Sequence, residues 1–115
     1  MIEPADVRFD VVDGTTVAHL SGEIDLSNAA LIRRSLAEFV SNTELKLVVD
    51  LCEASFLDSA AIRVLFDLSR RLAEHKQQLI VVVPTESLIR RSLEVSGLAS
   101  TVLMVATLEE AAAQR

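Results

Sequence analysis

Hydrophobic and polar residues alternate near the start of the chain in a pattern typical of two short strands. Val7–Val12 predicts the first strand and Thr15–Leu20 the second. Asp13-Gly14 lies between them, and this dipeptide favours a two-residue hairpin turn because both turn residues adopt positive φ. The segment Ser21–Asp25, which contains one glycine, is expected to be a turn. The chain is therefore expected to begin with an antiparallel hairpin.

Beyond the hairpin, stretches with helical spacing alternate with short β-rich runs. Four helices are expected, over Leu26–Val40, Asp58–His75, Glu86–Ser96 and Thr107–Gln114. Buried strands are expected over Leu45–Leu51 and Gln78–Val83, with a last short strand over Thr101–Val105. The segment Cys52–Leu57 is expected to be a short loop.

Residues at the helix ends and on one helix face refine this picture. Asp25 or Ser27 can cap the first helix and Thr85 the third, because their side chains accept hydrogen bonds from free backbone N–H groups. Gly97 is well placed to end the third helix in the left-handed conformation. The longest helix is expected to bury one stripe, formed by Ile62, Leu65, Phe66, Ser69, Leu72 and Ala73.

The order of elements is ββαβαβαα, or ββαβαβαβα if Thr101–Val105 joins the sheet. Strand–helix–strand crossovers are right-handed and give parallel neighbours, whereas the hairpin adds an antiparallel pair. We therefore expect an α/β fold with a mixed sheet of four to five strands, an N-terminal hairpin and about four helices. The chain has 115 residues, and since a domain takes roughly 100–200, residues 1–115 predict a single domain.

The amino-acid composition argues against several classes of protein. Half of the residues are hydrophobic, but there are only four Phe and no Tyr or Trp, so the core must be aliphatic. The net charge of −6 argues against nucleic-acid binding. Cys52 is the single cysteine and no metal-ligand spacing is present, so neither a metal nor another cofactor is expected. The apolar run Leu79–Val83 is far shorter than the ~20 residues of a membrane span, and with no signal peptide at the N-terminus a cytoplasmic protein is expected.

Two loops are candidates for function because they follow strands of the predicted sheet. In open α/β sheets the functional crevice lies beyond the carboxyl ends of the strands. These loops are Ser21–Ser27 and Cys52–Ala60, with Asp25 and Asp58 at matching places. Because both strands are expected to end at the same edge of the sheet, we expect the two loops to lie close together.

The pair Asp58-Ser59, at the start of the longest helix, has two interpretations. Short polar residues there are typical of a helix cap, which satisfies free N–H groups at the positive end of the helix dipole. Alternatively, Ser59 is a phosphorylation site. A phosphate would add about −1.5 to −2 charge beside the Asp58 carboxylate, which could abolish a docking surface without unfolding the protein.

Catalytic arrangements are not evident in the sequence. His19 and His75 form no Ser-His-Asp pattern, and Cys52 has no neighbouring base that would activate its thiol. An enzyme is therefore not expected. Three arginine pairs on helices are either solvated faces or contacts with an acidic partner surface, namely Arg33-Arg34, Arg70-Arg71 and Arg90-Arg91.

Three ordered segments, spanning about Val7 to Ala112, resemble a known family. The first is SGEIDLSNAALIRRSL, with its Gly-Glu-x-Asp pattern before a helix. The second is LVVDLCEASFLDSAAIRVLFDLSRRL, an apolar strand ending in Asp-Leu, then Phe-hydrophobic-Asp-Ser and a helix. The third is LIVVVPTESLIRRSLEVSGLAS, a strand ending in Pro and a helix ending in Leu-Glu-x-x-Gly-Leu. Together they resemble the STAS domain of bacterial anti-sigma factor antagonists.

The resemblance implies a partner-switching function. Ser59 corresponds to the phosphoacceptor serine, and residues around it are expected at the partner-binding surface, namely Asp25, Asp58, Ala60, Ala61 and Arg63. In this family the unphosphorylated antagonist binds an anti-sigma factor, which is itself a GHKL-type serine kinase, and the sigma factor is released. Phosphorylation of the serine breaks the complex, and a PP2C-type phosphatase resets it.

The chain departs from the family pattern at Ala61 and at Cys52. Ala61 stands where glycine is usual, which would place a methyl group beside the site that a kinase must approach, and Cys52 stands where a small polar residue is common. A second function stays open for the same fold. It is a constitutive interaction module, such as the STAS subunit of an ABC lipid-transport system or a stressosome-like scaffold.

Overall fold

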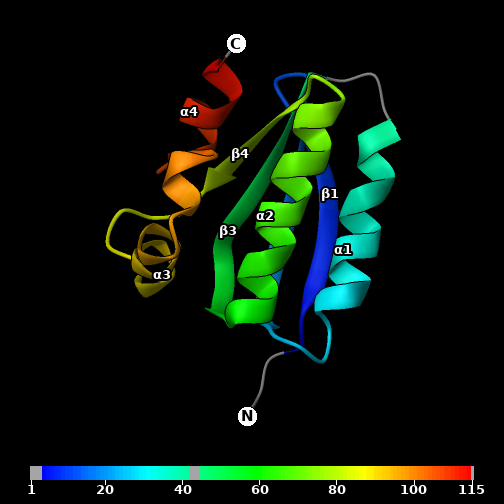
Figure 1. Ribbon diagram of the computed structural model, residues 1–115. Coiled ribbons are helices and arrows are strands. Elements are labelled where there is room, and N and C mark those ends of the chain that lie inside the picture. The colour runs from blue at the N-terminus through cyan, green and yellow to red at the C-terminus, as the bar shows by residue number, and fades with distance from the viewer. Residues whose placement is uncertain (1–3, 42–44, 115) are drawn as a thin grey trace.

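The computed structural model describes residues 4–41 and 45–114, which form one five-stranded sheet with helices on both faces (Figure 1). The strands are β1 (Asp6–Val12), β2 (Thr15–Ile24), β3 (Lys46–Leu57), β4 (Gln78–Val82) and β5 (Leu103–Val105). The α-helices are α1 (Ala29–Ala37), α2 (Ser59–Glu74), α3 (Leu88–Ser96) and α4 (Leu108–Ala113). Short 3-10 helices follow α1 and α3, at Glu38–Ser41 and Leu98–Ser100.

The strands lie in the order β1-β2-β3-β4-β5. β1 and β2 are antiparallel, and every other neighbouring pair is parallel. The expected mixed α/β sheet is confirmed, and because β5 pairs with β4, the element order is the longer of the two alternatives. The parallel strands β2, β3 and β4 therefore end at one edge of the sheet, where the chain turns into α1, α2 and α3.

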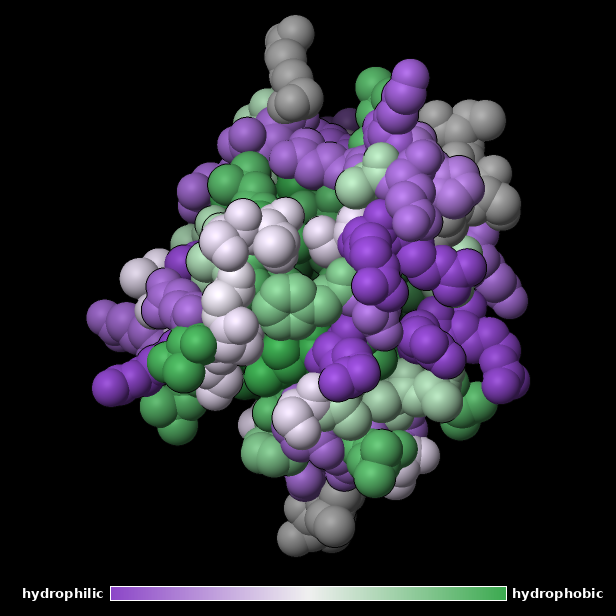
Figure 2. All heavy atoms as spheres, in the orientation of Figure 1, coloured by the Kyte–Doolittle hydropathy of each residue, from purple (hydrophilic) through white to green (hydrophobic). Residues whose placement is uncertain are grey.

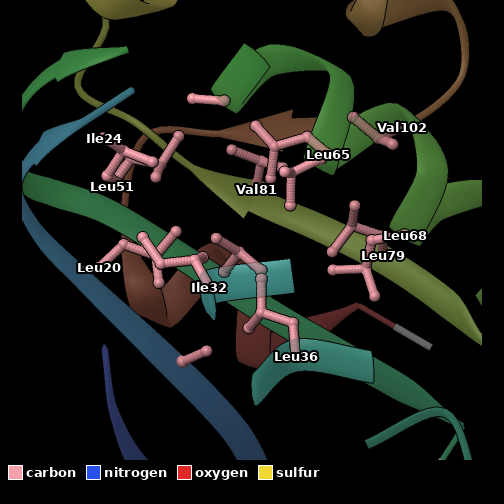
Figure 3. Close-up of a cluster of buried hydrophobic side chains, with 14 of the residues drawn as sticks. Leu20, Ile24, Ile32, Leu36, Leu51, Leu65, Leu68, Leu79, Val81 and Val102 are labelled. Carbon is pink, nitrogen blue, oxygen red and sulfur yellow. The ribbon is translucent and has the colours of Figure 1, made fainter. Parts of the chain in front are cut away.

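Two hydrophobic clusters lie on opposite faces of the sheet because neighbouring residues of a strand point to opposite sides. Val49 and Val81 belong to the larger cluster, under α1 and α2 (Figure 1), together with Leu36 and Leu72. Figure 3 shows part of this cluster, in which side chains of α1, α2 and the strands meet. Val48, Ile80 and Val82 face the smaller cluster, which α4 covers with Ala111. The core is aliphatic, as expected, apart from Phe39, the one buried aromatic side chain among the described residues.

The N-terminal hairpin follows from local sequence. Val12 pairs with Thr15, which leaves Asp13 and Gly14 as a two-residue turn. Their φ angles are 50° and 77°, which is the left-handed conformation that the Asp-Gly pair favours. The expectation for the hairpin is confirmed.

Two segments expected to be irregular are strand instead. Ser21–Asp25 was expected as a turn and Cys52–Leu57 as a loop, but β2 continues to Ile24 and β3 to Leu57. These segments pair with each other, from Ser21 opposite Glu53 to Ile24 opposite Leu57. Register shifts on both sides of the first pairs disturb the alternation of apolar residues. The local hydrophobic pattern therefore did not indicate these two strand segments, which are stabilised by pairing between residues far apart in the chain.

The buried stripe of α2 is rotated from the expected one. Its buried residues are Ala61, Val64, Leu65, Leu68 and Leu72, whereas the expected Ala73 is exposed and the expected Ile62, Phe66 and Ser69 are only partly buried. The rotation brings into the core three aliphatic side chains that the expected stripe did not include, Ala61, Val64 and Leu68. It also leaves Ile62 and Phe66 at the margin of the core, close to the start of the helix.

The helix starts differ from the expected caps at α1 and α3. α1 begins at Ala29 after Asn28, and α3 begins after Ser87, whose hydroxyl accepts a hydrogen bond from the Ile89 N–H at 3.0 Å. Neither Asp25, Ser27 nor Thr85 is the residue before a helix. Gly97 ends α3 with a φ of 89°, as expected. The side chain of Val40, the expected end of the first helix, lies outside the described part of the chain.

Candidate functional site

The two candidate loops meet at the edge of the sheet where β2 and β3 end. The backbone N–H of Asp58 donates to the carbonyl of Ile24 at 3.2 Å, and the N–H of Leu26 donates to Asp58 Oδ2 at 3.0 Å. The loop Asp25–Asn28 is thereby joined to the start of α2. The expected proximity of the two loops is confirmed.

Asp58 is the N-cap of α2. Its backbone is extended, and its Oδ1 accepts a hydrogen bond from the Ala61 N–H at 3.0 Å. Oδ2 accepts from the Leu26 N–H at the same time. One carboxylate therefore satisfies a free N–H group of the helix and a second N–H group in the neighbouring loop. A negative charge at this end of a helix also interacts favourably with the helix dipole. The cap interpretation therefore holds for Asp58.

Ser59 has no such structural role. It is the first residue of α2 and is exposed, and none of the residues in the described ranges hydrogen-bonds to its hydroxyl. The hydroxyl therefore faces solvent on a helix end that Asp58 already holds. A chemical change at Ser59 Oγ would alter the surface while leaving the cap intact.

Asp25 organises its own loop, and the hydrogen bonds of its side chain go to Ser27. Its Oδ1 accepts from the N–H of Ser27 at 2.9 Å and from the Ser27 hydroxyl. Asn28 closes the loop, since its Oδ1 accepts from the Asp25 N–H at 3.1 Å and its Nδ2 donates to the Glu23 carbonyl at 3.0 Å. Asp25 therefore shapes the segment that carries the exposed Leu26.

Among the other expected site residues, Ala61 lies in a different environment. Its side chain is 2 % exposed and packs in the core. The expectation that its methyl group lies at the surface that a kinase approaches is therefore wrong. Ala60 is half-buried and Arg63 is exposed, and both line a groove that also borders α1. Arg63 and Ser59 additionally share a shallow depression with Ile62, Phe66 and Asp67.

Apolar side chains lie on the segments that meet at the start of α2. Leu26 is 80 % exposed and Phe56 48 % exposed, and each lies within two residues of Asp25 or Asp58. Ile62 and Phe66, which lie three and seven residues after Ser59 on α2, are partly buried. Sequence reasoning assigned Ile62 and Phe66 to the core and left out Leu26 and Phe56. A leucine in an otherwise polar loop was the signal available for Leu26.

His19, Asp50 and Cys52 form a second polar cluster away from Ser59. His19 Nδ1 lies 2.7 Å from Asp50 Oδ2, and Asp50 Oδ1 accepts from the Cys52 N–H at 3.0 Å. Burial, a hydrogen bond to Asp50 and the charges of Asp50 and Glu53 raise the pKa of Cys52 to about 12. The thiol is therefore protonated at neutral pH, which agrees with the expected inert cysteine.

Within residues 4–41 and 45–114, no group of three or more His, Cys, Asp or Glu is arranged to hold a metal ion. No helix there is long and apolar enough to cross a membrane.

Comparison with known proteins identifies the fold. Residues 6–111 match the sequence profile of the STAS domain. The chain belongs to the STAS domain family. This STAS domain is 31 % identical over 113 residues to the anti-sigma-F factor antagonist RsfB of Mycobacterium tuberculosis, with 96 % of this chain and 91 % of that protein covered.

Solved structures agree with this assignment. The STAS domain superposes on an anti-sigma factor antagonist from Mycobacterium paratuberculosis with a TM-score of 0.79, at 26 % identity, over 94 % of this chain and 91 % of that one. The antagonist SpoIIAA in its unphosphorylated form shares the fold, with a TM-score of 0.71 at 20 % identity over 93 % and 94 % of the two chains. Proteins of this class are binding proteins and not enzymes.

Proposed function

We propose that this STAS domain is an anti-sigma factor antagonist whose binding to its partner is switched off by phosphorylation of Ser59. The observation that carries the proposal is the division of roles at the start of α2. Asp58 holds the helix end by accepting hydrogen bonds from Ala61 and Leu26, and the Ser59 hydroxyl has no hydrogen-bond partner among the described residues. A modification of Ser59 can therefore change the surface without removing these bonds. The named relatives support the partner class.

The unphosphorylated surface suits protein binding. The exposed Leu26 and the partly buried Ile62 and Phe66 provide apolar area near a neutral hydroxyl. Interfaces of this kind combine an apolar centre with a polar rim. Arg63 supplies a charge at the rim. In this proposal the partner is an anti-sigma factor in the cytoplasm, and its capture releases the sigma factor.

Phosphorylation opposes partner binding because it adds negative charge to this surface. The anti-sigma factor, acting as a GHKL-type serine kinase, transfers the terminal phosphoryl group of ATP to Ser59 Oγ, and ADP and a proton are released. The new group carries about −1.5 to −2 charge and lies next to the Asp58 carboxylate. Desolvating it against an apolar partner surface costs several kcal/mol per ion. A PP2C-type phosphatase then hydrolyses the phosphate ester and restores the hydroxyl.

Affinity capture with defined variants tests the proposal. Wild type, Ser59→Asp and Ser92→Asp are used as baits in the native lysate, and bound proteins are identified by mass spectrometry. Ser92 is an exposed serine on α3, so Ser92→Asp adds the same charge elsewhere. We expect wild type and Ser92→Asp to retain a kinase-like anti-sigma factor that Ser59→Asp loses, with thermal midpoints within about 2 °C.

The retained kinase then provides the second half of the test. With ATP it is expected to label wild type and not Ser59→Ala. Labelling of Ser59→Ala would refute the site. Retention of a permease, an ATPase or a scaffold protein equally by wild type and Ser59→Asp would instead support the constitutive interaction module.

A further inference from the structure

A groove between α1 and α2 begins beside Ser59 and runs along both helices. Near Ser59 it is lined by Ala60 and Arg63 of α2 and by Ala29, Ala30 and Arg33 of α1. Farther along, Arg33 lines it together with Arg70 and Arg71. Figure 2 shows the most hydrophilic side chains gathered over these two helices, in contrast to the more apolar surface beside them.

The charge of this groove is opposite to that of the protein. The chain has 17 acidic and 11 basic residues. Four of those basic residues line the groove, namely Arg33, Arg63, Arg70 and Arg71, against one acidic residue, Asp67. The Asp67 carboxylate lies 3.3 Å from Arg70 Nη2. Within residues 4–41 and 45–114, no carboxylate lies at ion-pair distance from the other three arginines.

Small side chains leave room in the groove for a bound polypeptide. Ala29, Ala30, Ala37 and Ala60 line its sides between the arginines. A polypeptide can therefore approach the helices closely while its side chains reach the guanidinium groups. Guanidinium groups bind carboxylates through two parallel hydrogen bonds. An acidic peptide is therefore the ligand whose charge is complementary to this groove.

The groove is continuous with the surface around Ser59. Arg63 lines both the groove and the depression that contains Ser59. Ser59 and Arg63 are four residues apart on α2 and so lie on the same helix face. A partner bound over Ser59 therefore has a path along which a further segment can follow α1 and α2.

We propose that this groove binds an acidic segment of the anti-sigma factor, with Arg33, Arg63 and Arg71 pairing with its carboxylates. This inference rests on the proposed function. It adds a second contact to the apolar one around Ser59 and selects partners by the charge of that segment. It also gives the phosphate a second effect, because a phosphate on Ser59 lies within one helical turn of Arg63 and competes with the segment for that guanidinium.

A peptide titration followed by NMR tests the groove directly. The probe is a twelve-residue peptide of alternating Glu and Ala, and the matched probe has Gln in place of Glu. We expect the acidic peptide to shift amide resonances of α1 and α2, with binding that weakens at least tenfold between 50 and 300 mM salt. The Gln peptide is expected to cause no shifts.

Charge-reversal variants give the site its control. Arg33→Glu and Arg71→Glu are expected to weaken peptide binding at least tenfold. Arg91→Glu makes the same change on α3, outside the groove, and is expected to weaken it less than twofold. Equal weakening by all three, or shifts spread over the whole surface, would overturn the proposal. If single-stranded oligo-dT of twelve nucleotides bound more tightly than the acidic peptide, the proposal would be overturned and the groove would be a nucleic-acid site.

The outcome is separable from that of the proposed function because the titration uses neither kinase nor anti-sigma factor. Peptide binding in the groove without phosphate transfer to Ser59 would refute only the switch. Phosphate transfer to Ser59 without peptide binding would refute only the groove.

Discussion

Asp58 joins two parts of the chain that are 32 residues apart in sequence. One carboxylate oxygen caps α2 through the Ala61 N–H, and the other accepts from the N–H of Leu26 in the neighbouring loop, both at 3.0 Å. Asp58→Ala removes both acceptors and a charge at the helix N-terminus. We expect this substitution to destabilise the whole fold, unlike any change at Ser59.

The expected magnitude follows from three contributions. Loss of an N-cap costs about 1 kcal/mol, and loss of the favourable interaction with the helix dipole costs about 0.3–1 kcal/mol. The Leu26 N–H is at an exposed position where water can replace the carboxylate, so its hydrogen bond adds about 0.5–1 kcal/mol. Asp58→Ala should therefore lower the free energy of unfolding by about 2–3 kcal/mol, or the thermal midpoint by about 8–12 °C.

Two further variants separate these contributions. Asn caps helices about as well as Asp, so Asp58→Asn should keep the bond to Ala61, lose the acceptor for Leu26 and cost about half as much. Ser59→Ala should cost less than about 0.5 kcal/mol because its hydroxyl has no structural partner among the described residues and Ala has the higher helix propensity. Urea unfolding followed by circular dichroism measures all three. If Ser59→Ala proved as destabilising as Asp58→Ala, the division of roles between the two residues would be refuted.

Two other predictions concern Gly97 and Cys52. An added Cβ at Gly97 would meet no atom within 4 Å, so Gly97→Ala should cost about 1–2 kcal/mol through its left-handed backbone alone; denaturant unfolding should show a smaller loss for Gly97→Asn. Because the pKa of Cys52 is raised from 9.0 to about 12, the unfolded thiol ionises first as the pH rises, so stability should fall between pH 9 and 12. Iodoacetamide should also alkylate Cys52 at pH 8 far more slowly than free cysteine, although the residue is exposed; a rate equal to that of free cysteine, measured by mass spectrometry, would show that the pKa is not raised.

Much of the fold followed from sequence because short-range interactions determine it. The Asp13-Gly14 turn, the cap at Asp58 and the left-handed end at Gly97 each depend on residues within a few positions of one another. The proximity of Asp25 and Asp58 was also predictable, since parallel neighbouring strands end at the same edge of a sheet. The position of the candidate site could therefore be inferred without coordinates.

The caps of α1 and α3 were placed wrongly by one to three residues, and the other errors fall where distant segments determine the outcome. The strand character of residues 21–24 and 52–57 comes from their mutual pairing, which no local pattern reports. The rotation of α2 about its axis depends on how the sheet and α1 pack against it. That rotation places Ala61 in the core and brings Ile62 and Phe66 to the edge of the surface around Ser59.

The amino-acid sequence by itself therefore determined the hairpin, the helix ends at Asp58 and Gly97 and the choice of Ser59 as candidate residue. The turn and these two helix ends depend on neighbouring residues, so they form whatever the rest of the chain does. Only the tertiary structure decided which side chains surround Ser59 and that the arginines of α1 and α2 line one groove. These features depend on the packing of two helices on a sheet, which is settled by contacts between residues far apart in the chain.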